Sequence, residues 1–392
     1  MIHRNFIVVA QKEWLDSVMW ALMFALATFF MLALAPPVQA QRFEDAVFNA
    51  VGVNNTGTAC LTAPIGTRLR DTICQIPANT AASSSGSTTA LSAEGQRVEE
   101  RKVGRLIGPV NVFISGDYER FDKKVTTFES GHKTNAGRLT IGADYAFSDR
   151  FLAGGAVKYG RDSGRFTAGG DFKTDSYGLQ LYGNFVPVAN SFINASAGYT
   201  SLKNAMSRVA LITKAGPPSP VGGIVFGDTD GEAFNIGLNS GYDFSFQGAT
   251  VGPRLGLRYK RTETDGYRER GNTGLELLYD AQTAKSLTSV VGLYGSKAIS
   301  TSFGVLVPQA TLEYVHEFQN SQRIINFRFV DNPAAGPFSF QNDRPDRNYF
   351  NIGLGIAVVW PHGISGFLNY RAMVGYNDRS SHTVTVGMRI EF

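Results

Sequence analysis

Histidine is the residue type in this 392-residue sequence best suited to acid–base chemistry. A serine hydrolase needs a histidine, a serine and a polar group that orients the histidine. No Gly-x-Ser-x-Gly elbow is present. His316 is the most suggestive position, because alternation places it on the apolar face of a strand near the strand end, whereas His362 falls in an expected turn. We predict that the chain is not an enzyme, a lipid hydrolase being the alternative. The histidines beyond the N-terminal leader are His132, His316, His362 and His382.

Two further sets of residues could bind or line something. Asp228, Asp230 and Glu232 alternate in one segment, which is a weak indication of calcium, and we expect no metal or cofactor. Charged residues also stand between apolar neighbours throughout the second part of the chain. They could line a conducting pore, or they could form ion pairs that hold a plug in place. This set is Arg138, Asp144, Arg254, Arg258, Lys260, Glu313, Arg371, Arg389 and Glu391.

The elements that position these charges are strands, and the last one is the clearest. Val384, Val386, Met388, Ile390 and Phe392 share one face of this segment, and polar residues share the other. Such alternation predicts a strand with lipid on one side and water on the other, although an edge strand of a soluble sandwich gives the same pattern. The terminal aromatic Phe392 resembles the assembly signal of bacterial outer-membrane barrels.

Similar alternation recurs from Pro109 onward and predicts twelve strands. Short links alternate with long ones, the latter at 121–134, 161–172, 203–231, 261–285 and 319–346. Outer-membrane barrels sort their turns and loops in this way, and a soluble sandwich has no reason to. Tyrosines near the strand ends fit interfacial girdles. The sequence therefore predicts an all-β protein, a twelve-stranded antiparallel transmembrane β-barrel spanning 108–392. The tyrosines are Tyr118, Tyr145, Tyr159, Tyr177, Tyr199, Tyr242, Tyr259, Tyr314, Tyr349 and Tyr376.

The N-terminal segment 1–40 has the pattern of a cleaved signal peptide. Basic residues precede an apolar run from Val18 to Ala35, and Val38-Gln39-Ala40 offers a cleavage site before Gln41. A permanent inner-membrane helix is the alternative. The leader is long, so the true start could also lie at Met19 or Met23.

Segment 41–90 is short and holds both cysteines, Cys60 and Cys74, ahead of a Ser/Thr-rich linker. In an exported chain this pair predicts a disulfide, two free thiols being the alternative. Segment 91–107 follows with Ser92 as a helix N-cap and charges behind it. Because its apolar residues are few, we expect a short N-terminal helix that needs a polar host such as a barrel lumen. A plugged lumen and an open porin remain the alternatives.

The run from Gly137 to Arg150 resembles the second strand and turn of autotransporter β-domains. The segments Asp175–Gly183, Pro308–Glu317 and Asn348–Phe392 also resemble that family. The resemblance covers about 108–392 and implies type V secretion: a twelve-stranded barrel with a helix through its pore and an upstream passenger. Passengers of that family are long and repetitive, whereas 41–90 has no repeat.

These observations predict a Gram-negative outer-membrane protein that anchors, and translocates or displays, its short N-terminal segment. A pore or surface-binding protein without a passenger is the alternative. We expect a monomer that meets outer-membrane lipid and lipopolysaccharide. The resemblance implies dependence on the barrel-assembly machinery and periplasmic chaperones. The net charge of +4 is spread along the chain and predicts no nucleic-acid partner.

Overall fold

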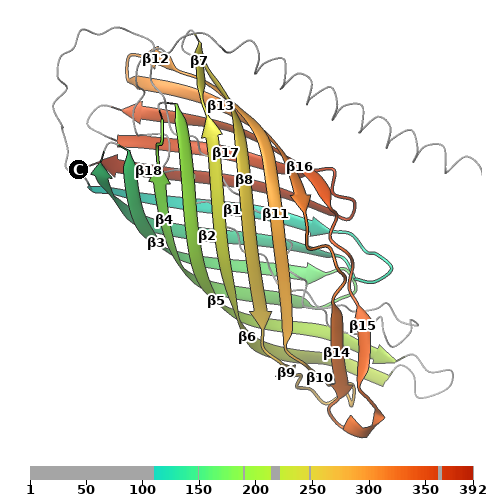
Figure 1. Cartoon of the computed structure of the whole chain (residues 1–392). Helices are drawn as coiled ribbons and strands as arrows, with labels where there is room; N and C mark the ends of the chain where they lie inside the picture. The colour runs from blue at the N-terminus through green and yellow to red at the C-terminus, as the bar shows by residue number, and fades with distance from the viewer. Residues whose placement is uncertain are drawn as a thin grey trace, which may run out of the picture. The chain divides into compact units, whose positions relative to one another are not determined.

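The computed structural model describes residues 110–148, 150–188, 190–212, 221–246, 249–360 and 364–391. The predicted signal peptide, cysteine pair, linker and lumen helix, together with His362 and Phe392, lie outside these ranges. Within them, no helix combines the length and the apolar character needed to cross a membrane. The described part is built almost entirely from antiparallel strands (Figure 1).

Twelve long strands form one closed ring, as the sequence predicts. Each of the twelve long strands pairs with the long strands that precede and follow it in the chain, and the short strands between them do not change this order. The first and last strands close the ring through thirteen residue pairs, from Asn111↔Glu391 to Lys123↔Arg379. Closure leaves no unpaired edge, which a membrane-spanning sheet cannot tolerate. In chain order, the strands are β1 (Val110–Lys123), β2 (His132–Ser148), β3 (Phe151–Phe166), β4 (Asp171–Phe185), β5 (Ser191–Ile212), β6 (Val221–Tyr242), β8 (Ala249–Thr264), β11 (Gln282–Lys297), β13 (Gly304–Glu317), β16 (Asn348–Trp360), β17 (Ile364–Val374) and β18 (Arg379–Glu391).

The two faces of the ring differ in chemistry. Outward residues are apolar and exposed, and on β18 they include Val384, Val386 and Met388. Inward residues are mostly polar and buried. This is the apolar-out, polar-in alternation of an outer-membrane barrel. Tyr349 is 3% exposed and packs inward against the ring of Tyr376, at 5.4 Å. The prediction that these two tyrosines belong to a lipid-facing girdle is therefore wrong.

The links at one end of the barrel are all short, whereas the other end carries the longest links, 265–281 and 318–347, so we call them the short-turn end and the long-loop end. The long link expected at 161–172 shortens to 167–170, because β3 and β4 continue as paired strands into that segment. The strands continue further at the long-loop end than the sequence predicts. β5 and β6 remain paired as far as Ile212↔Val221, inside the segment 203–231 that was expected to be a loop. Outward residues there include Ser207 and Asp228 beside the exposed Ile224 and Phe226, so the regular apolar-out pattern of the membrane-spanning part is lost.

Two long-loop connections fold into a small second sheet, which we call the cap sheet. It consists of β9 (Tyr267–Arg268), β10 (Leu277–Tyr279), β14 (Ile324–Phe329) and β15 (Phe338–Gln341), in the order β15-β14-β10-β9. A short 3-10 helix, Pro333–Ala335, follows β14. Figure 1 shows these strands grouped beyond one end of the long strands. Two further short strands, β7 (Phe244–Phe246) and β12 (Ile299–Thr301), extend hairpins at the short-turn end.

Candidate functional site: the barrel lumen and its long-loop mouth

Asp144 is the centre of a buried polar cluster near the short-turn end of the lumen. Its carboxylate accepts hydrogen bonds from Asn111 Nδ2 at 2.7 Å, Tyr182 Oη at 3.1 Å and Arg389 Nη2 at 3.1 Å. The Asp144 side chain is fully buried. A buried charge is tolerated only when it is paired and hydrogen-bonded, and here both conditions hold. Arg389 and Asp144, predicted as lumen charges, are thus brought together across β18 and β2.

A second cluster lies nearer the long-loop end. Arg138 Nη2 donates to Glu119 Oε2 at 2.9 Å, and Ser381 Oγ donates to the other carboxylate oxygen at 2.7 Å. Asp162 Oδ1 stands 3.8 Å from the same guanidinium nitrogen. These side chains come from β2, β1, β18 and β3. The cluster therefore ties together the strands on both sides of the closing seam.

Arg254 and Glu313 anchor two further groups on the inward face. Arg254 pairs with Asp243, and its guanidinium carbon lies 4.9 Å from the Phe192 ring centroid and 4.8 Å from that of Tyr294. Such stacking adds a cation–π attraction to the ion pair. Glu313 stands 3.9 Å from Arg371. Arg254, Asp243 and Glu313 are all buried on the inward face.

The remaining predicted lumen charges are Lys260, Arg258 and Glu391. Lys260 is buried, and Arg258 is half-buried on the same strand. Glu391 occupies the end of β18, opposite Asn111. Its side chain, like Phe392, lies outside what the structure describes.

Two buried amides on the inward face carry no hydrogen bond within the described part of the chain. Asn184 of β4 and Asn194 of β5 lie directly opposite each other, and each is 2% exposed. Both the nitrogen and the oxygen of each amide lack a partner. Buried amides are nearly always hydrogen-bonded in native proteins. This stretch of the wall therefore offers donors and acceptors to whatever occupies the lumen.

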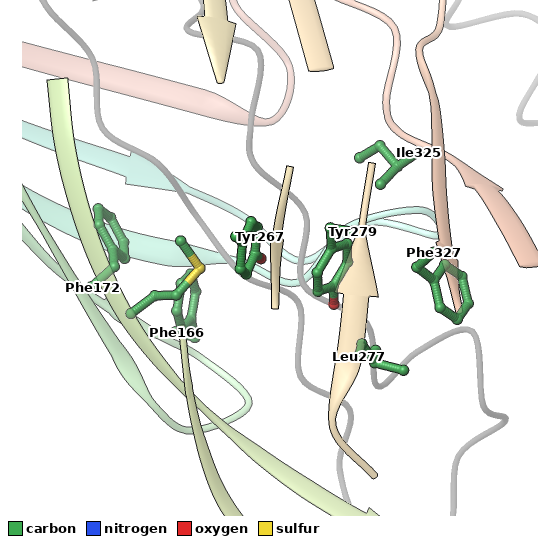
Figure 2. Close-up of a cluster of buried hydrophobic side chains, with 8 residues drawn as sticks. Phe166, Phe172, Tyr267, Leu277, Tyr279, Ile325 and Phe327 are labelled. Carbon is green, nitrogen blue, oxygen red and sulfur yellow. The ribbon is translucent and has the colours of Figure 1, made fainter. Parts of the chain in front are cut away.

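The long-loop mouth is covered by the cap sheet, which has its own hydrophobic core (Figure 2). Inward-facing Phe166, Phe172 and Met206, at the ends of β3, β4 and β5, supply one side of it. The cap sheet supplies the other side with Tyr267, Leu277, Tyr279, Ile325 and Phe327. The rings of Tyr267 and Tyr279, on neighbouring strands of the cap sheet, stack at 4.8 Å (Figure 2). The loops are thus packed as a small folded unit.

A buried ion pair fixes the cap sheet to the wall. Arg208 of β5 donates from Nε to Glu269 Oε1 at 2.7 Å and from Nη2 to Glu269 Oε2 at 2.5 Å. Leu277 N also donates to Glu269, at 2.8 Å. Bidentate pairing is the strongest arrangement available to arginine and carboxylate. Backbone hydrogen bonds between Phe226 and Arg270 add a second attachment to β6.

Segment 318–347, between β13 and β16, crosses the mouth, and we call it the mouth strap. Its Ile325 and Phe327 belong to the same hydrophobic core as Phe166, Phe172 and Met206 of β3–β5, which lie on the opposite side of the ring from β13. It then returns to β1, where Lys123 Nζ donates to Asp343 at 2.6 Å. Lys123 is also paired with Glu129 at 3.0 Å and Asp378 at 2.5 Å. The strap is therefore anchored on two sides of the opening.

Comparison with known proteins agrees with this architecture. The model of the autotransporter β-domain family matches residues 112–371. The chain belongs to the autotransporter β-domain family. It is accordingly a protein of the bacterial outer membrane. The translocator domain of autotransporter NalP from Neisseria meningitidis has a similar fold, with a TM-score of 0.58 at 18% identity over 72% of this chain and 88% of that one. The beta domain of the Bordetella autotransporter Brka gives 0.53 at 16% identity, over 72% and 100%.

Curated relatives are much longer than this autotransporter barrel. Outer membrane protein B of Rickettsia rickettsii is 23% identical over 271 residues, which are 67% of this chain and 16% of that protein. Esterase EstA of Pseudomonas aeruginosa is 24% identical over 297 residues, which are 73% and 43%. The chain thus spans less than half the length of either relative.

The histidines of the autotransporter barrel have different surroundings. His132 is buried, and its Nδ1 lies 3.1 Å from Thr134 Oγ1. His316 is on the outward face, with Nδ1 2.7 Å from Asn348 Oδ1. Ser289 stands opposite it on β11, but no hydrogen bond joins Ser289 to His316 among the described contacts.

His382 also faces outward, with Nδ1 2.7 Å from Tyr370 Oη. Ser289, His316 and Asn348 therefore form a row across β11, β13 and β16. The hydrogen bond by which a histidine activates a nucleophilic serine is not among the described contacts.

The three acids that weakly indicate calcium in the sequence, Asp228, Asp230 and Glu232, lie apart on the outward face of β6. Asp228 is paired with Arg270, and Glu232 accepts from Tyr199 Oη at 2.8 Å. Asp230 is exposed beside Lys203 in the strand register. No group of three or more metal-ligating side chains that could hold an ion occurs within the described ranges.

Sequence reasoning missed the residues that close the mouth. Lys123, Glu269 and Asp343 carry no local motif, and their partners are distant in the chain. The aromatic density of β14 and β15, with Phe327, Phe338 and Phe340, was the available signal. Phenylalanines at every second position in a segment taken for a solvated loop indicate a sheet with one buried face.

Proposed function

We propose that this barrel anchors in the outer membrane and carries its N-terminal segment 41–90 through the lumen to the cell surface. Segment 91–107 then remains in the lumen as a helix. The observation that supports this most directly is the inward face itself, with paired charges and the unpartnered amides of Asn184 and Asn194. A polar chain segment can satisfy such groups, whereas an apolar one cannot.

The composition of 91–107 complements that wall. The segment carries seven charges of both signs, so it can pair with carboxylates and guanidinium groups alike. The wall presents the same mixture. The charged residues of the segment are Glu94, Arg97, Glu99, Glu100, Arg101, Lys102 and Arg105.

The mouth strap gives the proposal a second step. A chain leaving the lumen must pass 318–347, which is anchored to β1 by Lys123 and to β3–β5 by the cap-sheet core. The strap therefore moves aside during passage and seals the opening afterwards.

Surface display is tested in intact cells that express the full chain. A protease-cleavable epitope is inserted at Gly57, and external protease is added. Cleavage is expected if the segment reaches the surface. The matched control carries the epitope at Arg150, in a short turn that faces the periplasm when the long loops face outward. Protection of the Gly57 epitope in cells whose barrel is correctly assembled would contradict display and favour a barrel without a passenger.

Occupation of the lumen is tested by conductance. The full chain and a variant lacking 80–106 are reconstituted in planar bilayers. We expect the deletion to raise single-channel conductance clearly. Equal conductance of the two proteins would show that this segment does not plug the pore.

We further propose that insertion requires the barrel-assembly machinery and periplasmic chaperones, and that the protein works as a monomer. The proposal rests on family membership and on closure of the ring within one chain. Depletion of the assembly machinery should leave the protein unfolded in the periplasm. Sedimentation in detergent should give a single copy.

We also propose that the barrel acts without hydrolysing lipid. One arrangement favours the opposite: Ser289, His316 and Asn348 form a row on the outward face, in a family with an esterase among its relatives. The variants Ser289→Ala and His316→Ala, reconstituted in fluorogenic phospholipid vesicles, decide the question. We expect the unaltered protein and both variants to release the fluorophore at the same background rate. Release above background that both variants abolish would establish a hydrolase.

A further inference from the structure

The outward face changes abruptly beyond the tyrosines of the long-loop end. Tyr118 of β1 and Tyr159 of β3 are 54% and 38% exposed and mark the boundary of the apolar wall. Beyond them, Arg120, Lys133 and Arg165 point outward from three adjacent strands. We call these three residues the basic patch.

The strand register places like charges of the basic patch side by side. Lys133 of β2 is directly opposite Arg165 of β3. Like charges directly opposite each other destabilise a sheet unless an anion offsets them. The acids nearby offer little: Asp122 is 3.7 Å from Lys133 Nζ, in a solvent-exposed pair. Asp171, opposite Arg165, already accepts from Ser207 Oγ at 2.6 Å.

Neighbouring outward cations provide a contrast on the same face. Arg161 donates to Asp175 at 2.6 Å, and Lys173 lies 3.4 Å from the same carboxylate. Lys203 of β5 is placed between Asp175 and Asp230 in the register. We call Arg161, Lys173 and Lys203 the matched set, because none of them is directly opposite another cation in the strand register. The basic patch differs in this respect, since Lys133 and Arg165 face each other, although each has an acid on its other side.

We propose that the basic patch binds the phosphate groups of lipopolysaccharide. The basic patch lies on the outward face of β1–β3, directly beyond the lipid-contacting tyrosines. Its natural ligand is therefore a membrane anion and not a soluble partner that would bind at the loop tips. Phosphates on the lipid A headgroup of the outer leaflet supply that charge. Arginine binds phosphate through two hydrogen bonds, and lysine acts as a point charge beside it.

The test compares two variants of the full chain with the same loss of charge. The patch variant is Arg120→Gln, Lys133→Gln and Arg165→Gln, and the control variant is Arg161→Gln, Lys173→Gln and Lys203→Gln. Binding of purified bis-phosphorylated lipid A to the detergent-solubilised proteins is measured by native mass spectrometry. We expect the patch variant to lose affinity by about tenfold or more and the control by about threefold or less. Retained heat-modifiability on gels shows that both variants are folded.

Two further probes define the ligand. Lipid A without phosphates should bind the unaltered protein as weakly as intact lipid A binds the patch variant. Heparin represents a soluble polyanion of the cell surface. Equal loss in both variants, no loss in either, or patch-dependent binding of heparin without binding of lipid A would overturn the proposal. The measurement needs no passenger, so its outcome is independent of surface display.

Discussion

Lys123 at the end of β1 and Asp343 in the mouth strap form a 2.6 Å ion pair across 220 residues of sequence. The Lys123 side chain is 2% exposed, and three carboxylates surround it. The pair joins the closing seam of the barrel to the loop that crosses its opening. It is therefore the natural place to test whether the mouth opens.

Replacing Lys123 by Met should release one end of the mouth strap. It leaves buried carboxylates unpaired, a loss typically worth about 3–5 kcal/mol. We expect faster proteolysis within 318–347 and more frequent channel openings in planar bilayers. The control is Lys124→Met, because the exposed Lys124 ammonium donates to the Asn377 backbone carbonyl at 3.3 Å and forms no ion pair among the described contacts. Identical behaviour of the two variants would show that the strap is held elsewhere.

Arg208 and Glu269 should be strongly coupled. Arg208→Met or Glu269→Gln alone leaves a buried partner uncompensated, and each is expected to destabilise the cap sheet by about 3–5 kcal/mol. The double variant should be less destabilised than the sum of the two. Hydrogen exchange of amides 267–279 reads this local stability, and amides 350–356 of the barrel wall serve as internal control. Additive effects would mean that the pair does not hold the cap.

Glu276 should make the cap sheet sensitive to acid. Burial opposes its ionisation, but hydrogen bonds from the Thr273 backbone and hydroxyl, at 2.8 and 3.0 Å, outweigh burial and lower the pKa of Glu276. A carboxylate whose folded pKa is lowered stabilises the fold above its unfolded pKa, and this contribution is lost as pH falls through the folded pKa. At neutral pH, amide exchange around 273–277 should therefore be slower in the unaltered protein than in the Glu276→Gln variant. The difference should vanish in strong acid, and a constant difference would exclude ionisation as its cause.

Deletion of Phe392 should impair membrane assembly before any other property. In the sequence the residue follows β18, whose outward face includes Val384, Val386 and Met388. We expect less heat-modifiable protein in the outer membrane and more degradation in the periplasm. Phe392→Tyr keeps a terminal aromatic and should assemble normally. Full assembly of the deletion variant would remove the proposed role in recognition.

The membrane-spanning part of the fold was predictable because its physics is local. Alternation around Val384 and Met388 identified β18, and loop parity identified the ring. The outer continuation of β5 and β6 is not predictable from alternation, because polar outward residues such as Ser207 of β5 and Asp228 of β6 interrupt the apolar outward pattern. The ion pairs at Asp144 and Arg389 could be assigned to the inward side, but not to each other. Register and tilt over the whole ring decide which charges meet.

The seam between β1 and β18 sets a timetable for biogenesis. Val112 has its partner in Ile390, so the ring cannot close until almost the entire barrel has left the ribosome and crossed the inner membrane. Until then β1 presents a bare edge, which must be shielded from other chains. A nonsense mutation anywhere before β18 therefore yields an open sheet with unpaired, aggregation-prone edges in place of a smaller barrel.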